Sequence, residues 1–445
     1  MSRHLGRAGV GRMTKSLKNL LTFCLVVAGF TACMWVVAWM VRPPLGERPL
    51  PYTSEQIEQA KRDRDVHFDP NHTPSLHRDI KVEPKAEAPV LAELVNEGKL
   101  PPLKDRLPLE PAVMEGEEGI GKYGGAWRRL ANQPSDIETI TYRLAGGSMM
   151  RFSPLGNPVV PHIAKSLTSS PDKRVWTVKL REGMRWSDGH PYTTDDVMYY
   201  WNCEANNKYV LAAPPAWAIL NGKVARVAAI DKYTFTISFD DPCLLMPERL
   251  VTRDMCDSPA HYLRPMHPDP AIGDAELCER LMKAYKQPSR TALYVYMHVS
   301  QGSWQNSEHP RLWPWIYHTY RPGTPQIFVR NPYYYVVDTA GNQLPYLDRV
   351  QFDVQDPKIL SLTAANGGAS MQDRHIRFSD YTELMSRRES SGTRILHWYP
   401  AIRSVWVINP NQNKRVDPDD PSSKWKAQLL SDKRFRQALS VAINR

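Results

Sequence analysis

The stretch that decides the fold runs from Pro161 to Trp201 and reads PHIAKSLTSSPDKRVWTVKLREGMRWSDGHPYTTDDVMYYW. Within it, Val175–Leu180 alternates between two sets of side chains, with the period of a half-buried strand. Glu182-Gly183 then predicts a tight turn, and Met184–Trp186 predicts a second short strand. The stretch therefore begins with two strands joined by a turn.

A capped helix is predicted after these strands. Asp188-Gly189 is a turn signal, and Thr193 or Thr194 suits the N-cap position because its hydroxyl can accept a hydrogen bond from a free amide. Asp195-Asp196 would lie in the first turn, where carboxylates oppose the helix dipole. This local order contains no nucleophile, no catalytic pair of carboxylates and no phosphate-binding loop.

The apolar pattern predicts further elements along the chain. These are a helix over 88–98, the first strand of the body at Trp127–Leu130, a strand pair over 225–239, a helix over Asp274–Tyr285, a strand at Val350–Val354, a helix over Phe378–Arg388, and strands at Thr393–Tyr399 and Ser404–Ile408. Alternation with period two predicts the strands, and apolar recurrence every three or four residues predicts the helices. The mixture predicts an α/β protein.

The order of these residues resembles family-5 extracellular solute-binding proteins, the peptide- and nickel-binding receptors of ABC importers. One group of matching phrases is Ile163–Leu167, Leu180–Gly189 and Asp195–Val197, and a second is Arg330–Tyr335 followed by Gly341–Asp348. The resemblance implies a two-lobed α/β fold, periplasmic-binding-protein-like (class II), that closes on a ligand by hinge motion. It implies no catalysis and no cofactor, and a structural role for Arg181 and Asp188.

The resemblance also covers the end of the chain. Residues 430–445 resemble the helix that opens the second lobe in full-length relatives, and the sequence ends there. The resemblance therefore implies that the second lobe is largely missing and that the sequence is a fragment or comes from a truncated gene.

Five segments are predicted from composition and resemblance together. They are a cytoplasmic basic tail (1–19), a transmembrane signal anchor (20–41), a Pro- and charge-rich tether with a pre-domain (42–118), a first lobe (119–390) with a small inserted subdomain around 151–300, and the truncated start of a second lobe (391–445).

The predicted anchor, Leu20–Val41, carries no charge and is long enough to cross a bilayer as a helix. The basic tail before it predicts a single-pass protein with its body in the periplasm or the extracellular space. A cleaved signal peptide is one alternative, although the apolar run is long for that purpose. A lipoprotein signal is another, although cleavage at Cys33 would leave the apolar sequence MWVVAWMV on the mature protein.

Charge and cysteine content exclude some classes of function. The formal net charge is +10, but no dense basic run is interleaved with aromatic residues, so nucleic-acid binding is not expected. Outside the predicted anchor, Cys203, Cys243, Cys256 and Cys278 allow three disulfide pairings, among which the sequence does not choose. His261, Met266 and His267 lie in Pro-rich loop text with no regular ligand spacing, so no metal site is predicted.

Candidate ligand contacts come from strand ends and from the resemblance. Asn132 and Gln133 follow the first predicted strand of the body, and ligands bind at strand ends in open α/β sheets. The resemblance implies that this loop opens toward the cleft. It also implies that Trp406 and Asn409 lie where the floor of the cleft would be.

We therefore predict the substrate-binding component of an ABC importer, which captures a solute for ABC permease and ATPase subunits. A peptide is the expected solute because peptides are the most frequent ligands of the family. Related receptors take nickel, sugars or opines, and the sequence does not select among these ligands. A sensory or scaffolding receptor without a transporter is an alternative. An exported hydrolase is a weaker one, because neither a Gly-x-Ser-x-Gly nor a His-Glu-x-x-His motif is present.

Overall fold

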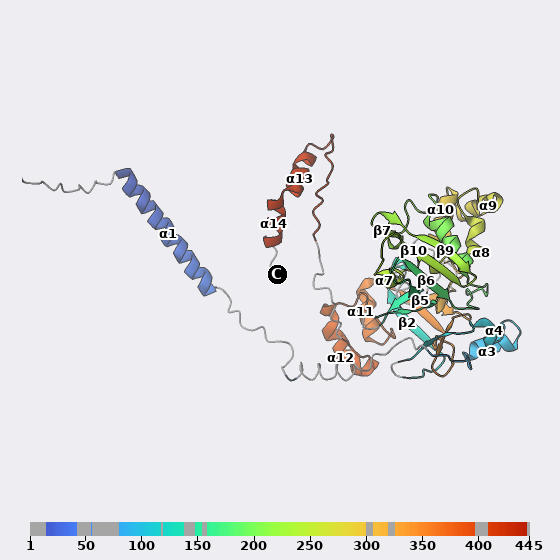
Figure 1. The fold of residues 1–445 in the computed structure, drawn as a ribbon. Helices are drawn as coiled ribbons and strands as arrows, with labels where there is room; N and C mark the ends of the chain where they lie inside the picture. The colour runs from blue at the N-terminus through green and yellow to red at the C-terminus, as the bar shows by residue number, and fades with distance from the viewer. Residues whose placement is uncertain are drawn as a thin grey trace, which may run out of the picture.

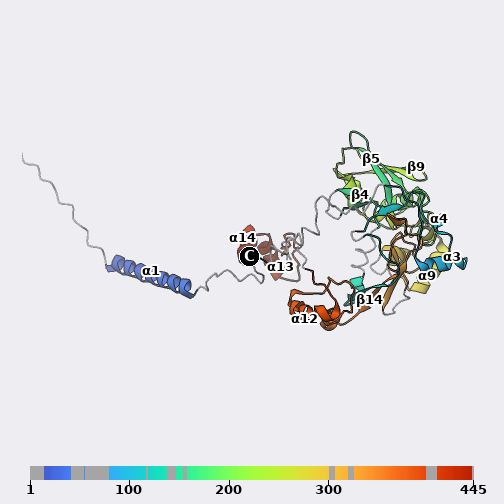
Figure 2. The same cartoon turned by 90° about the horizontal axis from the view of Figure 1, so that it is seen from below.

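The computed structural model describes residues 15–41, 55, 80–116, 119–137, 147–153, 158–299, 306–318, 325–396 and 408–442. Over these residues the chain contains two four-stranded sheets together with helices, so the predicted α/β class is confirmed (Figure 1). Figure 2 shows β5 and β9 on one side of the body and β14 with α12 on the other.

The first sheet has the strand order β11-β12-β14-β2. Its strands are β11 (Trp315–Tyr317), β12 (Gln326–Arg330), β14 (Arg349–Val354) and β2 (Ala126–Ala131). Strands β14 and β2 are parallel, in a register that pairs Val350 with Trp127 and Val354 with Ala131, and the other two pairings are antiparallel. The strands predicted at Trp127–Leu130 and Val350–Val354 are thus confirmed, and they are neighbours although distant in sequence.

The second sheet is antiparallel, with the strand order β5-β6-β10-β9. Its strands are β5 (Ala164–Ser169), β6 (Val175–Leu180), β10 (Thr234–Ser238) and β9 (Arg226–Asp231). The predicted strand at Val175–Leu180 and the predicted pair over 225–239 are both confirmed. Trp176, Val178 and Leu180 supply the buried face of β6 to the largest apolar cluster of the described residues.

The second strand predicted at Met184–Trp186 is wrong. Arg185 forms only an isolated bridge with Pro191, between turns on both sides. Met184 and Trp186 are nevertheless fully buried, at 0% exposure each. Their apolar side chains therefore enter the core from an irregular segment, because the flanking turns prevent a strand ladder from extending.

The predicted capped helix is confirmed as α6 (Thr194–Tyr199). The Thr193 hydroxyl accepts a hydrogen bond from the Asp195 amide at 3.1 Å, and the Thr193 amide donates to the Asp196 carboxylate at 3.0 Å. This reciprocal arrangement is a capping box. The chain continues as a π-helix, η1 (Tyr200–Ala205).

Further α-helices lie before, between and after these strands in the sequence. They are α3 (Pro89–Asn96), α4 (Leu103–Arg106), α7 (Met246–Arg249), α8 (Ala260–Leu263), α9 (Ala275–Tyr285), α10 (Arg290–Tyr294), α11 (Pro357–Ala365), α12 (Tyr381–Ser391), α13 (Ser422–Ser431) and α14 (Lys433–Ala442). The predicted helices over 88–98, 274–285 and 378–388 are confirmed, and Asp274 caps α9 by accepting a hydrogen bond from the Leu277 amide.

Short strands that the sequence pattern did not predict complete the described fold. Three pairs occur: β1 (Ala112–Met114) with β13 (Val336–Asp338), β3 (Met150–Phe152) with β4 (Val159–Pro161), and β7 (Ile219–Leu220) with β8 (Lys223–Val224). Strands of two or three residues are too short to show a period, which explains why they were missed.

Predictions near the end of the chain are met in part. The single helix expected over 430–445 is divided between α13 and α14 at Asp432, and residues 443–445 lie outside the described part. The strand predicted at Thr393–Tyr399 is wrong over 393–396, which have no strand partner, and 397–399 are not described. The strand predicted at Ser404–Ile408 lies outside the described residues apart from Ile408.

The N-terminal segment forms helix α1 (Lys15–Val41). No helix of the described residues is long and apolar enough to cross a membrane, so the predicted anchor over 20–41 is not supported.

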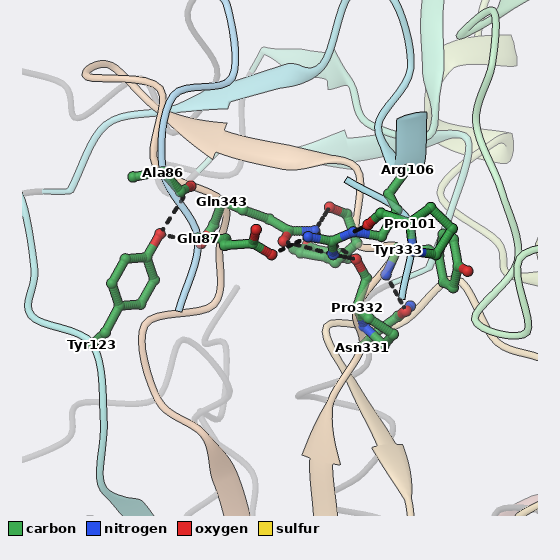
Figure 3. Close-up of polar contacts among 10 residues, drawn as sticks. Ala86, Glu87, Pro101, Arg106, Tyr123, Asn331, Pro332, Tyr333 and Gln343 are labelled. Carbon is green, nitrogen blue, oxygen red and sulfur yellow. Dashed lines mark hydrogen bonds and ion pairs between the residues drawn. The ribbon is translucent and has the colours of Figure 1, made fainter. Parts of the chain in front are cut away.

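A buried guanidinium joins the segment around α3 and α4 to the body of the protein (Figure 3). Arg106 is 0% exposed, and its Nε donates to the Pro101 carbonyl at 2.9 Å. Its terminal nitrogens donate to the Pro332 carbonyl, to the Glu87 carboxylate and to Gln343 Oε1. Burial lowers the pKa of Arg106, and the ion pair with Glu87 opposes that effect.

The same contacts explain the two phrases around 330–348 that carry much of the resemblance. Gln343 donates from Nε2 to the carbonyls of Pro332 and Tyr334, at 3.0 and 3.1 Å. The Tyr123 hydroxyl donates to the Gln343 carbonyl at 2.9 Å, as Figure 3 shows. Asp338, 1% exposed, accepts a hydrogen bond from Tyr346 at 2.7 Å. These polar side chains are therefore structural and hold the backbone in place.

Replacing Arg106 with Met should destabilise the protein by about 3–5 kcal/mol, because the buried guanidinium is lost and the partly buried Glu87 carboxylate and two backbone carbonyls lose their donor. Arg106→Lys should recover only part of this loss, since an ammonium cannot reproduce the guanidinium fork. Lys104→Met, on the exposed face of the same helix, is the matched control. The measurement is the free energy of unfolding in urea, and a loss below about 1 kcal/mol for Arg106→Met would contradict the assignment.

A second buried charge organises the region between η1 and α10. Glu204 is 3% exposed and accepts a hydrogen bond from Ser258 Oγ at 2.7 Å and another from the Tyr294 hydroxyl. His298 Nε2 lies 3.3 Å from the same carboxylate, and His298 Nδ1 contacts His309 at 3.1 Å. Although burial alone would raise the pKa of Glu204, His298 and the two hydroxyl donors hold it below its ordinary value.

Glu204→Gln should lower the free energy of unfolding at pH 7 by about 3 kcal/mol. Because the folded-state pKa of Glu204 is lowered, the ionised carboxylate stabilises the protein above the unfolded value of about 4.3. This contribution is lost as pH falls through the folded-state pKa. Urea unfolding from pH 7 to pH 3 should therefore show a smaller acid-induced loss in the variant, whereas parallel curves would argue against an ionised Glu204.

Candidate functional site

The carboxyl ends of β2 and β14 form one edge of the first sheet, because these strands are parallel and adjacent. Asn132 directly follows β2, and Gln355 directly follows β14. The backbone N–H of Gln355 donates to the Ala131 carbonyl at 2.8 Å, so the two chain segments remain together beyond the strands. Ligands of open α/β sheets bind at such carboxyl edges.

Two amide side chains at this edge have unused hydrogen-bonding capacity. Asn132 Oδ1 and Gln355 Oε1 are both buried atoms that accept no hydrogen bond from the described residues. A buried polar atom without a partner costs about 1–3 kcal/mol, so such atoms usually meet a ligand or water. Gln133, next to Asn132, is exposed. The edge therefore carries side-chain amides that can form hydrogen bonds with a polar solute.

The loop that carries Asn132 is fixed by a buried carboxylate. Asp136 is 2% exposed and accepts hydrogen bonds from Arg374 Nε and from His375 Nε2, the latter at 2.6 Å. The Asp136 carboxylate also accepts a hydrogen bond from the backbone N–H of Asn132 at 3.3 Å. His375 has a φ of +64°, a conformation that is strained for a side chain of its size. Asp136 therefore joins the loop after β2 to the segment before α12.

The same segment covers the outer side of β2. Gln372 accepts from the Leu130 amide at 3.0 Å and donates to the Leu130 carbonyl at 3.1 Å, as a neighbouring strand would. Arg129 and Asp373 form an ion pair at 2.7 Å. The charged side chains of Arg129 and Asp136 are thus neutralised within the protein, which leaves uncharged amides at the edge.

The predicted site residues have different outcomes. Asn132 and Gln133 lie at the carboxyl edge of β2, where they were expected. Asn409 is exposed on the segment before α13, and the structure shows no contact between it and that edge. Helices α13 and α14 lie apart from both sheets in the two views (Figures 1 and 2). Trp406 lies outside the described residues. A ligand role for Asn132, Gln133, Trp406 and Asn409 stays a prediction.

Sequence reasoning missed Gln355, Asp136 and His375. Gln355 could have been found, because it follows a predicted strand in the same way as Asn132 does. The partners of Asp136 could not have been found, because they come from a segment more than two hundred positions away in the sequence.

The structure also bears on the cysteines and on metal binding. The four body cysteines are buried free thiols, and burial raises the pKa of each, so they are poor nucleophiles: Cys203, Cys243, Cys256 and Cys278. No group of three metal-ligating side chains occurs in the part of the chain that the structure describes. His261 instead contacts Asp188 at 2.7 Å and stacks on His190.

Asp136→Asn should lower the free energy of unfolding by about 2–3 kcal/mol, since hydrogen bonds to a buried charge are lost. It should also speed amide hydrogen exchange in the loop after β2. Asp353→Asn on β14 is a matched control, because Asp353 contacts Gln351 at 3.2 Å and forms no ion pair with any described residue. Equal exchange rates in the two variants would show that Asp136 does not fix this loop.

Comparison with known proteins gives a consistent assignment. The sequence pattern of the family described as "Bacterial extracellular solute-binding proteins, family 5 Middle" matches residues 158–445. The periplasmic alpha-galactoside-binding protein of Rhizobium meliloti (strain 1021) is 27% identical over 381 residues, which cover 80% of this chain and 51% of that protein. The chain spans about half the length of the curated relatives it matches.

Two solved structures share the fold. An oligopeptide-binding protein OppA is 33% identical, with a TM-score of 0.66 over 82% of this chain and 56% of that one. The periplasmic binding protein MelB from Agrobacterium fabrum C58, in complex with stachyose, has a TM-score of 0.58 and 22% identity over 83% of this chain and 57% of that one. The predicted α/β, periplasmic-binding-protein-like fold is thereby confirmed, and the chain belongs to the bacterial extracellular solute-binding proteins of family 5.

Proposed function

We propose that this chain is the substrate-binding component of an ABC importer and captures its solute outside the cytoplasmic membrane. Membership of a solute-binding family supports the binding role. The observation that carries the proposal is the pair of unused amide oxygens, on Asn132 and Gln355, at the carboxyl edge of two adjacent parallel strands. The ABC permease and ATPase subunits would be its partners in transport.

A peptide is the proposed solute. An amide side chain both donates and accepts hydrogen bonds, and so does a peptide backbone. The likeness to an oligopeptide-binding protein supports this choice. Because the charges of Asp136 and Arg129 are already paired, the edge suits an uncharged portion of the solute, such as peptide groups between its termini.

An oligosaccharide is the second candidate, and a specific observation favours it. One relative is named for binding alpha-galactosides, and a similar fold was solved in complex with stachyose. Sugar hydroxyls also donate and accept, so Asn132 and Gln355 could serve them through the same atoms.

Binding without catalysis is part of the proposal. Ser258, His298 and Glu204 bring a serine, a histidine and a carboxylate into contact, as a hydrolase triad would. Ser258 is only 1% exposed, and its hydroxyl donates to Glu204 at 2.7 Å, whereas His298 Nε2 lies farther away at 3.4 Å. An activated nucleophile must donate to a base and reach its substrate, so this set supports a structural role and not the hydrolase alternative.

The test is calorimetric titration of the 445-residue chain with trialanine and, separately, with stachyose. The proposal expects trialanine to bind. Asn132→Ala and Gln355→Ala should each raise Kd about tenfold, because each removes a hydrogen bond that contributes about 1.4 kcal/mol to the binding free energy. Gln351→Ala, which removes an amide from the interior of β14, should leave Kd unchanged. Binding of stachyose alone would favour the second candidate, and variants with unchanged Kd would place the solute elsewhere.

A further inference from the structure

A groove separate from the carboxyl edge lies between α6 and α8. It has a volume of about 460 Å³ and is lined by α6 and η1 on one side and by α8 and the following turn on the other. Its floor includes the apolar side chains of Met198 and Tyr199, and its walls include Asp195 and Arg264. A cavity of this size can hold a small molecule.

One positive and one negative side chain line this groove without a charged partner. Arg264 is exposed, its guanidinium lies 5.0 Å from the centre of the Tyr199 ring, and it forms no ion pair with any described residue. Asp195 is also exposed and likewise forms no ion pair in the described part of the chain. The groove therefore presents two opposite charges that do not neutralise each other.

A buried nitrogen at the same groove also has no partner. His261 lines the groove, and its Nδ1 is buried and makes no hydrogen bond with the described residues. Its Nε2 is used by Asp188 at 2.7 Å, and its ring stacks on His190 with centroids 3.9 Å apart. Nδ1 is the ring nitrogen that Asp188 leaves unused, and an imidazole nitrogen that carries no hydrogen is an acceptor. An ammonium group is a donor that could satisfy it.

The floor of the groove is rigid before any ligand arrives. The Tyr199 hydroxyl shares a hydrogen bond of 2.9 Å with Tyr294, which donates to the buried Glu204. The Cys203 carbonyl, on η1, contacts His267 Nε2 at 2.8 Å. A preformed floor reduces the entropy that binding must otherwise overcome.

We propose that this groove binds a small zwitterion with an apolar body, of the kind represented by a free amino acid. Its carboxylate pairs with Arg264, its ammonium lies between Asp195 and His261 Nδ1, and its apolar part packs on Met198. This site is distinct from the solute site at the carboxyl edge, and it does not depend on the identity of that solute.

The test uses L-leucine as the probe, with N-acetyl-L-leucine lacking the ammonium and L-leucinamide lacking the carboxylate. Titration of the 445-residue chain should show that leucine binds and that each derivative binds at least tenfold more weakly. Arg264→Gln should weaken the binding of leucine at least tenfold without affecting the binding of leucinamide. Asp195→Asn should weaken the binding of leucine without affecting the binding of N-acetyl-leucine. Arg264→Lys should restore part of the affinity because it keeps the charge.

Arg280→Gln, an exposed substitution on α9 away from the groove lining, is the matched control and should bind leucine as the wild type does. Each variant replaces an exposed side chain, so thermal unfolding should show that all remain folded at the temperature of the titration, with Asp195→Asn and Arg264→Gln slightly less stable because they lose a helix-dipole contact and a contact with the Tyr199 ring. Unchanged trialanine and stachyose titrations in Arg264→Gln would keep this result separate from the solute site. Absence of leucine binding to the wild type, or equal leucine binding by Arg264→Gln, Asp195→Asn and the wild type, would overturn the proposal.

Discussion

The parallel pairing of β2 with β14 is the constraint on which the candidate site depends. It aligns Val354 with Ala131, so the residues that follow both strands emerge at one edge. If the two strands were antiparallel, their carboxyl ends would lie at opposite edges of the sheet, and Asn132 and Gln355 could not face the same ligand. The buried carboxylate of Asp136 then fixes the loop that carries Asn132. The site is thus built from backbone geometry first and from side chains second.

Buried ions serve this fold as connectors between segments that are distant in sequence. Arg106 connects the segment around α3 and α4 to the turn at Pro332, Asp136 connects β2 to the segment before α12, and Glu204 connects η1 to α10. Each ion has several hydrogen-bond partners, which offset the cost of removing it from water. The amide oxygens at the carboxyl edge and the charged side chains of the groove have no such partners among the described residues. A ligand could therefore form hydrogen bonds or ion pairs with them.

Much of the fold could be predicted from local pattern. The strand at Val175–Leu180 and the cap at Thr193 are local features, because alternation and capping involve residues within a few positions. Met184–Trp186 shows the limit of local pattern. Met184 and Trp186 are apolar and buried, yet the segment pairs with no strand of the described residues, because pairing depends on tertiary contacts that local pattern does not reveal. The position of Asn132 at the sheet edge was predicted from its place after a strand, whereas the partners of Asp136 required knowledge of which distant segments meet.

The most direct measurement is hydrogen–deuterium exchange of the 445-residue chain, alone and saturated with whichever of trialanine or stachyose binds. A solute held at the carboxyl edge should slow exchange of the backbone amides over 132–136 and at Gln355, and leave β9 unchanged because it belongs to the other sheet. Protection confined to other segments, with unchanged exchange at 132–136 and 355, would contradict the placement of the solute at this edge.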